Sequence, residues 1–357
     1  MKTRSWTKRG LTAKASSQRG MSLIELMISL VLGLLVTAAV YQIYSANQRS
    51  SRMQDALSQV QENGRFALET LGRDARQSGY RGGCANDSPL TNHLDSSAAG
   101  YEAELFELQA GLKGWDDSGG TYESDLKNYV TGTDVVLIKH FATPAGTTLN
   151  GLPGINSDTI TVDDTSGVPK GAILVVADAL GCDVFQNTDK ADTTHFDRSA
   201  NAGVSPGNQA SASSPLSKSY DANAQIMRFE SSLYYLGKST ADDGANALRR
   251  RSYSNGAIAQ DEELITGIVD MQIRYGVDTS GDGQVNSYVP ADSGHIDPDW
   301  RNVLAISFHL LLRDEAPNIL LLPASLSFAN GTFNAASNDL RLYQAFTTTV
   351  GIRNRLR

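Results

Sequence analysis

The chain has 357 residues, of which 40% are hydrophobic and 20% are charged, and its formal net charge at pH 7 is −8. This length allows one large domain or two small ones. Six of the 31 Lys and Arg residues lie in the first 20 positions, and without this segment the formal charge would be −14. Because so acidic a chain has no positive surface to follow phosphates, we expect no nucleic-acid partner.

The first predicted element is an apolar helix at residues 21–44, preceded by a basic segment, residues 1–20. At about 1.5 Å per residue the helix would measure roughly 36 Å, which is enough to span the hydrocarbon core of a bilayer. The basic segment contains no Asp or Glu, so the positive-inside rule predicts a single span of the inner membrane with the N-terminus in the cytoplasm. Everything after Tyr44 would then lie on the periplasmic side.

The junction of these two segments, Gly20-Met21-Ser-Leu-Ile-Glu25, differs from an ordinary secretory signal. A secretory signal has its small cleavage-site residue after the apolar region, whereas Gly20 precedes it. The junction resembles the processing site of type IV prepilins, although that family usually has Phe at the position of Met21. The resemblance implies that a prepilin peptidase cleaves after Gly20 and N-methylates Met21.

Glu25 is the only charged residue of the apolar helix. An ionisable group inside a membrane span costs several kcal/mol unless it is paired, so we interpret Glu25 as a functional residue. The prepilin resemblance implies that it pairs during filament assembly with the new amino group of Met21 on a neighbouring subunit. The alternative is that Glu25 lies near the membrane face and reaches the lipid headgroups.

Residues 45–80 are predicted to continue the helix with one apolar face. Apolar or small residues recur there at alternating steps of four and three, and polar residues fill the other positions. The stripe consists of Met53, Leu57, Val60, Gly64, Ala67, Leu71 and Ala75. Gly79, Gly82 and Gly83 then supply a helix stop. We expect this half to pack on a globular head; a two-stranded coiled coil is the alternative.

The sequence contains two cysteines, Cys84 and Cys182. In an exported protein an even number of cysteines favours a disulfide. A bridge between these two would close a loop of 98 residues and contribute about 3 to 5 kcal/mol in the chain-entropy description. The alternative is two unrelated buried thiols.

Strand-like runs fill residues 81–357, which we expect to form one β-rich head. They lie at residues 134–140, 159–162, 172–177, 225–236, 248–253, 264–275, 302–312 and 340–354. Residues 187–219 are rich in Ser, Ala, Asn and Asp and are predicted to be a low-complexity loop. A helix followed by strands indicates the α+β class, with the long helix packed on an antiparallel sheet.

A candidate calcium site follows the strand predicted to end at Tyr275. Oxygen-bearing side chains alternate along this run, and a glycine occupies its sixth position, as in the first half of an EF-hand-type loop. The ligands would be Asp278, Ser280, Asp282, the backbone carbonyl of Gln284, and Asn286. Val289 stands where such loops have a bidentate Glu, so another acid (Asp292, Asp297 or Asp299) would have to complete the shell. The alternative is a polar hairpin turn without calcium.

Catalytic motifs are weak, and we predict that the protein is not an enzyme. Gly203-Val-Ser205-Pro-Gly207 has the spacing of a nucleophile elbow. It lies within the low-complexity loop, where no strand is predicted to enter it and no helix to leave it. The five histidines form no HExxH motif or other short metal-ligand spacing.

Three further runs resemble minor pilins of the PilW family. They are Gly64-Arg-Phe-Ala with Gly79-Tyr-Arg-Gly, Arg274-Tyr-Gly-Val-Asp leading into Gly281-Asp-Gly, and Thr349-Val-Gly-Ile-Arg-Asn-Arg. The resemblance implies a pilin-like fold and a low-abundance subunit at the tip of a type IVa pilus. It also implies contacts with the major pilin and other minor pilins, priming of pilus assembly, and presentation of a PilY-type adhesin at the cell surface.

The sequence leaves two other functions open. A pseudopilin of a type II secretion system would have the same N-terminal motif. Gene deletion would separate the two, because loss of pili and twitching motility marks a minor pilin and loss of secreted enzymes marks a pseudopilin. A periplasmic binding protein on an uncleaved signal anchor is the other alternative, and in that case Gly20 would be dispensable.

Overall fold

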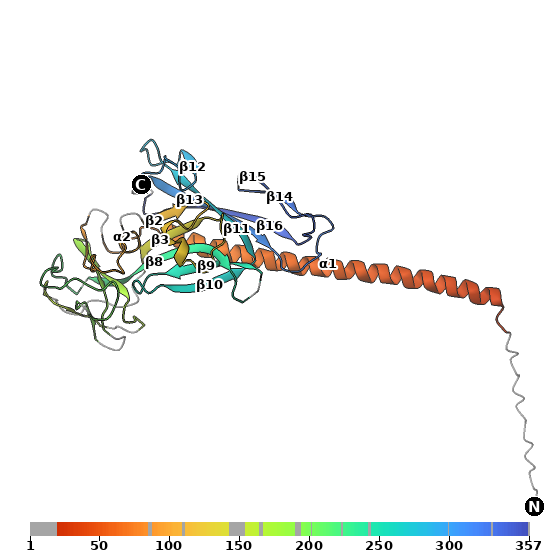
Figure 1. Ribbon diagram of the computed structural model, residues 1–357, viewed down its shortest axis with the longest axis horizontal. Helices are drawn as coiled ribbons and strands as arrows, with labels where there is room; N and C mark the ends of the chain where they lie inside the picture. The colour runs from red at the N-terminus through yellow and green to blue at the C-terminus, as the bar shows by residue number, and fades with distance from the viewer. Residues whose placement is uncertain are drawn as a thin grey trace, which may run out of the picture. The chain divides into compact units, whose positions relative to one another are not determined.

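The computed structural model describes residues 20–84, 88–108, 111–142, 154–163, 167–189, 194–200, 202–222, 224–241, 244–298, 300–329 and 331–355. The chain divides into two units, Met1–Gln54 and Asp55–Arg357. One helix, α1 (Leu23–Gln77), runs from the first unit into the second, and the second unit is rich in strands (Figure 1). The predicted α+β class with a long N-terminal helix is confirmed.

The first unit consists of the apolar part of α1. Every residue from Gly20 to Arg52 is exposed, and the large apolar side chains between Leu23 and Tyr44 are 54–77% exposed. Among the described residues α1 is the one helix long and apolar enough to cross a membrane. A surface of this kind requires an apolar environment, because so large an exposed apolar area is unfavourable in water.

In the second unit, one face of α1 is buried against the head. The buried positions are Ala56, Val60, Gly64, Ala67, Thr70, Leu71, Gly72 and Ala75. The predicted stripe is therefore confirmed from Val60 to Ala75. The assignment of Leu57 to the stripe was wrong, because Leu57 is 39% exposed and Ala56 is buried instead. Ala56 and Leu57 lie four and three positions before Val60, so both border its face; the head covers Ala56 and leaves Leu57 partly exposed.

A four-stranded antiparallel sheet packs against this face of α1. Its strand order is β12-β11-β13-β16. The strands are β11 (Ile268–Val277), β12 (Ser287–Val289), β13 (Val303–Arg313) and β16 (Tyr343–Gly351). Small residues let the helix approach β16 closely: a methyl group at Gly64 would lie 2.7 Å from the ring of Phe346, and one at Gly72 would lie 3.5 Å from Val350.

A larger sheet of eight strands forms the rest of the head. Its main path is β1-β6-β5-β8-β3-β2, while β9 pairs with β8 and with β10. The strands are β1 (Leu90–Asn92), β2 (Leu112–Trp115), β3 (Val135–Phe141), β5 (Ile173–Asp178), β6 (Gly181–Gln186), β8 (Gln225–Lys238), β9 (Asn246–Ser252) and β10 (Gln260–Thr266). All pairs are antiparallel except β1 with β6. The head therefore contains two main sheets, and the β1–β6 pair is the parallel exception among the described strand pairs.

Short elements complete the head. They are the helix α2 (Ala103–Phe106), the 3-10 helix η1 (Gly120–Asp125), the strand pair β4 (Thr159–Thr161) and β7 (His195–Asp197), and the strand pair β14 (Ser325–Phe328) and β15 (Gly331–Asn334). Buried apolar side chains form three clusters. The first lies between α1, the four-stranded sheet and one face of the larger sheet, and the other two involve mainly residues before position 230.

The predicted strand at residues 264–275 is in fact two strands in different sheets. Gly267 separates β10 from β11 with a φ of +87°, a conformation that only glycine adopts without strain. Its amide donates to the carbonyl of Asn246, and its carbonyl accepts a hydrogen bond from the amide of Arg313. The chain therefore turns from one sheet into the other at this glycine.

The low-complexity segment 187–219 is irregular but folded in its described residues. Besides β7, it contains Arg198, whose side chain is fully buried. The guanidinium donates to three carbonyls, those of Ser157 at 2.9 Å, Ser214 at 3.1 Å and Ile155 at 3.2 Å. A buried cation with several acceptors fixes the backbone around it, because an unmade bond would leave a buried charge unsatisfied.

Asp134 joins the two sheets at the start of β3. Its carboxylate accepts the amide N–H of Asp117 at 2.8 Å and that of Ile273 in β11 at 2.7 Å. Its own N–H donates to the carbonyl of Met271. Burial raises the pKa of this carboxyl to about 7, although the two amide bonds act in the opposite direction.

We predict that Gly64→Val lowers the free energy of unfolding by about 1–3 kcal/mol, because the branched side chain would overlap the ring of Phe346. The measurement is denaturant unfolding of the full chain in detergent micelles, followed by tryptophan fluorescence. Adding Phe346→Ala makes room for the valine, so the double variant should lose less stability than the sum of the two single variants. Strictly additive losses would contradict the contact.

The raised pKa of Asp134 predicts that its contribution to stability falls as the pH rises. Its pKa is about 7 in the folded protein and about 3.9 in an unfolded chain, so the folded state binds the additional proton between these values. The contribution is complete below about pH 4 and is lost by about pH 7, with an upper limit on the order of 4 kcal/mol.

The test compares urea unfolding of the unaltered protein and Asp134→Asn at pH 5 and pH 8. The asparagine does not titrate, so the stability difference between the two proteins should change with pH. An equal difference at both pH values would show that Asp134 does not titrate in this range.

Candidate functional site

The residues of the predicted processing site lie directly before α1. Gly20, Met21 and Ser22 precede the helix and are exposed. The carbonyl of Ser22 accepts a hydrogen bond from the amide of Leu26 at 3.1 Å, which makes Ser22 the N-cap residue. The site is therefore an exposed segment without regular secondary structure, followed at once by a regular helix.

Glu25 is the third residue of α1 and lies in its first turn. The partial positive charge of a helix N-terminus favours a carboxylate at this position. Within the described residues, this carboxylate has no hydrogen-bond or ionic partner, and its neighbours Leu23, Ile24 and Leu26 are exposed apolar side chains. Glu25 therefore presents an unpaired negative charge inside an apolar surface.

Ser22 is a site residue that the sequence analysis missed. The spacing Ser22-Leu-Ile-Glu25 is that of a capping box, in which the serine and the acid three positions later bind the first free amides of the helix. The signal was present in the sequence, within the same six residues as the processing site. Among the described residues, however, neither side chain makes a capping hydrogen bond; the bond present at this end is the one from the amide of Leu26 to the carbonyl of Ser22.

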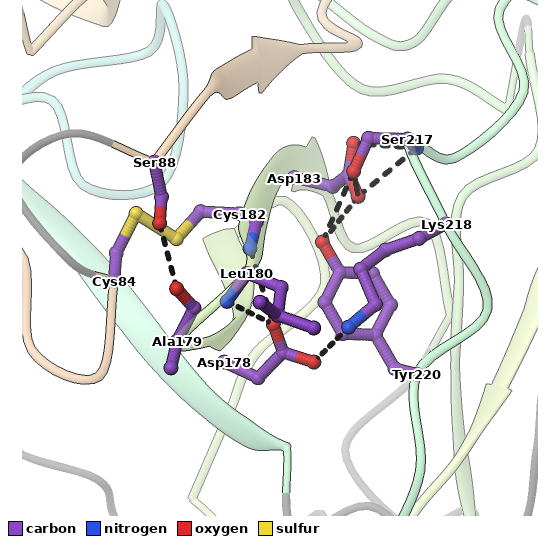
Figure 2. The surroundings of a disulfide bond; sticks show 11 residues. Cys84, Ser88, Asp178, Ala179, Leu180, Cys182, Asp183, Ser217, Lys218 and Tyr220 are labelled. Atoms are coloured by element: carbon purple, nitrogen blue, oxygen red, sulfur yellow. Dashed lines mark hydrogen bonds and ion pairs between the residues drawn. A yellow bond between two sulfur atoms is a disulfide. The ribbon is translucent and has the colours of Figure 1, made fainter.

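Cys84 and Cys182 form a disulfide with a Cα–Cα distance of 5.9 Å (Figure 2), within the usual range for such bridges. Cys84 follows the glycine-rich stop of α1, and Cys182 lies in β6. Beside the bridge, the Ser88 hydroxyl donates to the carbonyl of Ala179 at 2.8 Å (Figure 2). The disulfide fastens the chain just after α1 to β6 of the larger sheet, the strand between β1 and β5.

A buried polar network lies next to this bridge. His93 Nε2 is 2.6 Å from Asp183 Oδ1, and its Nδ1 is 2.7 Å from the hydroxyl of Ser214. Figure 2 shows Ser217 and Tyr220 on the same carboxylate, with the Ser217 hydroxyl at 2.7 Å. Burial raises the pKa of Asp183, but hydrogen bonds from His93, Tyr220 and Ser217 outweigh it, so that the pKa is lowered.

Ser214, His93 and Asp183 are hydrogen-bonded to one another in the same way as the members of a serine-hydrolase triad. Their surroundings nevertheless indicate a structural role. The amide N–H of Ser214 donates to the carbonyl of Ala210 at 2.9 Å, so it is not free to bind an oxyanion. Asp183 shares its charge with Ser217 and Tyr220. The network therefore holds residues 214–220 against β6.

Ser205, the central residue of the elbow-like motif, lies in an irregular segment. Its carbonyl accepts hydrogen bonds from the amide of Ala257 at 2.8 Å and from the side chain of Gln186 at 3.0 Å. In the described part of the chain, no strand leads into it and no helix follows it. This is not the strand–turn–helix context that the motif requires.

The candidate calcium residues occupy the connection between β11 and β12. The carboxylate of Asp278 accepts amide N–H groups from Ser280, Gly281 and Gly283 at 2.6–3.1 Å. The side-chain oxygen of Asn286 accepts the amide of Thr279 at 2.7 Å. The loop is therefore closed by its own hydrogen bonds.

The predicted ligands are only partly brought together. The Ser280 hydroxyl lies 3.2 Å from Asp278 Oδ1 and 3.3 Å from Asn286 Oδ1, whereas Asp282 accepts the amide of Gln284 instead. Among the described residues, no group of three or more His, Cys, Asp and Glu side chains is placed to hold a metal ion. Asp297 binds backbone amides nearby, and Asp299 is outside the described residues. Calcium binding therefore stays a prediction.

Two protein-family models match the sequence. The model described as Type IV Pilus-assembly protein W covers residues 233–354, and the model of the Prokaryotic N-terminal methylation motif covers residues 15–41. No curated protein and no solved structure matches the chain. The methylation-motif match confirms the resemblance of the N-terminus to prepilins, and the pilus-assembly match covers the runs that begin at Arg274 and Thr349, up to residue 354, whereas the run from Gly64 to Gly82 lies outside both.

These matches correspond to distinct parts of the structure. Residues 15–41 include Gly20, Met21 and Glu25, and indicate a membrane-anchored, pilus-associated protein. Residues 233–354 run from the middle of β8 to beyond β16 and include the whole four-stranded sheet. Residues 42–232, which contain the disulfide and the His93–Asp183 network, lie outside both matches.

We predict a small effect of calcium on thermal stability, because only one carboxylate contributes to the three gathered oxygens. For a site in the 0.1–1 mM range, millimolar calcium should raise the Tm by about 2–4 °C relative to chelator-treated protein. Asp278→Asn should abolish the shift, and magnesium should not reproduce it. Identical melting curves with calcium and with chelator would show that the loop is a plain hairpin turn.

Proposed function

We propose that this type IV pilus-related pilin is a minor pilin that primes pilus assembly at the filament tip. The observation that carries the proposal is the N-terminal arrangement of α1. A cleavable glycine junction precedes an apolar helix whose single acid, Glu25, has no partner within the described residues. An arrangement of this kind fits a subunit that leaves the bilayer for a bundle of similar helices.

The first step is insertion and processing. The leader, residues 1–20, stays in the cytoplasm while the head crosses to the periplasm, as the positive-inside rule requires. A prepilin peptidase then cleaves after Gly20, and Met21 becomes the methylated N-terminus. Cleavage removes six positive charges close to the membrane and leaves one ammonium group at the start of α1.

The second step is transfer of α1 into the filament. Lipid tails and neighbouring apolar helices are similar environments, so the exposed Leu, Ile and Val side chains gain little from the exchange. A charge pair between Glu25 and the Met21 amine of another subunit is worth more in these surroundings than in water. Glu25 therefore selects the partner helix and its axial position.

The head supports a position at the filament tip. Residues 84–232 add most of the eight-stranded sheet to the part that matches the pilus-assembly family. Inside a helical filament every head is surrounded by neighbours, whereas at the tip one side is open. A head enlarged in this way is accommodated most easily at the tip, where contact with a PilY-type adhesin is also possible. The major pilin and other minor pilins would contact the side of the head that faces the filament.

We predict that Glu25→Gln reduces copurification of the protein with other pilins by at least tenfold, because removal of one partner of a buried charge pair costs about 3–5 kcal/mol. The measurement is quantitative mass spectrometry of pilin complexes extracted from membranes. Glu62→Gln is the matched control, since Glu62 is an exposed acid on the same helix.

The same samples test the processing step through the mass of their N-terminal peptide. A chain starting at methylated Met21 is expected for all three proteins. A mature protein that keeps Met1 would contradict the prepilin mechanism as a whole. If the N-terminus is methylated Met21 but Glu25→Gln copurifies normally, the chain is a processed pilin whose assembly does not depend on pairing of Glu25.

A further inference from the structure

A polar cavity of about 300 Å³ lies beside α1 on one face of the eight-stranded sheet. The pairing register brings its residues together: Ser232 of β8 is opposite Ser252 of β9, which is opposite Gln260 of β10. His140 of β3 lies one pair further along, opposite Glu230. Residues two apart on a strand share a face, so these side chains line one wall.

Four charged groups of the cavity form two ion pairs with one another, and Arg228 Nε, although ion-paired, makes no hydrogen bond in the described structure. Arg250 Nε is 2.5 Å from Glu262, and Arg228 Nε is 3.6 Å from Glu230. Tyr234 also donates to the Asp74 carboxylate of α1. A charged ligand would have to break one of these pairs and leave its partner uncompensated. The ligand that fits this cavity is therefore neutral.

Three polar side chains of the cavity have no partner in the described structure. His140 is only 6% exposed, and its Nδ1 makes no hydrogen bond. Ser232, which is 5% exposed, and Gln260 at the rim also make no hydrogen bond to a described residue. A buried polar group left unsatisfied costs about 1–3 kcal/mol, so this wall lacks a hydrogen-bonding occupant.

We propose that this cavity binds a neutral saccharide. The imidazole, hydroxyl and amide groups can each donate and accept hydrogen bonds, and sugar hydroxyls do the same. A volume of about 300 Å³ is at the lower end of small-ligand sites, which suits one sugar unit. Among the described residues no Phe, Tyr or Trp lines the cavity, so no such ring stacks on the sugar, and we expect a millimolar affinity.

This proposal is independent of the role in pilus assembly. All lining residues belong to the head and to the part of α1 that packs on it, and none is in the N-terminal site. A saccharide site on an exported head would let the protein contact glycans outside the cell. Its failure would leave the assembly proposal untouched.

The experiment is saturation-transfer NMR on the full chain in micelles of a zwitterionic detergent without a sugar headgroup. The probes are glucose, galactose and N-acetylglucosamine, with glucuronic acid and glucosamine as charged counterparts. We expect saturation transfer to at least one neutral sugar and at least tenfold weaker binding of its charged counterpart.

Two variants locate the site. Ser232→Val removes a buried hydroxyl from the wall, and Gln260→Leu changes an exposed rim position, where substitutions usually change stability by less than about 0.5 kcal/mol. Each should weaken saccharide binding at least tenfold, whereas Ser327→Val, on an exposed position of β14, should not. No transfer to any neutral sugar at millimolar concentration, preference for the charged sugars, or unchanged binding by both variants would overturn the proposal.

Discussion

The exposed apolar surface of α1 is the constraint on which the rest of the molecule depends. About twenty consecutive side chains of this helix are unburied in their own unit, and removing them from water is worth far more than any single polar contact. This requirement confines the chain to a membrane or to a bundle of apolar helices. It also explains why the single acid of this surface, Glu25, is important for specificity, because nonpolar contacts alone do not distinguish one such environment from another.

The head is built around the other half of the same helix. Here α1 has a narrow face of small residues, so the backbone lies close to β16 and the helix is held by shape rather than by large side chains. Two specific contacts also fix this packed half of α1 and its C-terminal end. Asn63 donates to the carbonyl of Thr266, and the disulfide at Cys84 follows the C-terminal turn. From Asp55 onward, the helix and both sheets therefore form one compact unit.

Features encoded within a few neighbouring residues could be predicted from the sequence. The span, the glycine stop, most of the buried stripe and the long strands rich in Val, Ile and Leu are of this kind. β6 was not predicted, because Asp183 and Gln186 interrupt its apolar pattern; both are buried, and their partners His93, Ser217 and Asn208 are distant in sequence. The cavity was missed for the same reason, since only the register of four strands brings His140 and Gln260 to one wall.

The division of the core explains how such a head can vary without loss of its helix packing. The cluster under α1 draws mainly on strands of the part that matches the pilus-assembly family, whereas the other two clusters draw mainly on residues 84–232. β8 links them, because its first half pairs with β5 and its second half pairs with β9. The middle segment is held by a disulfide, a buried arginine and the His93–Asp183 network. These fastenings are largely internal to the segment, so changes within it leave the contact between α1 and β16 intact.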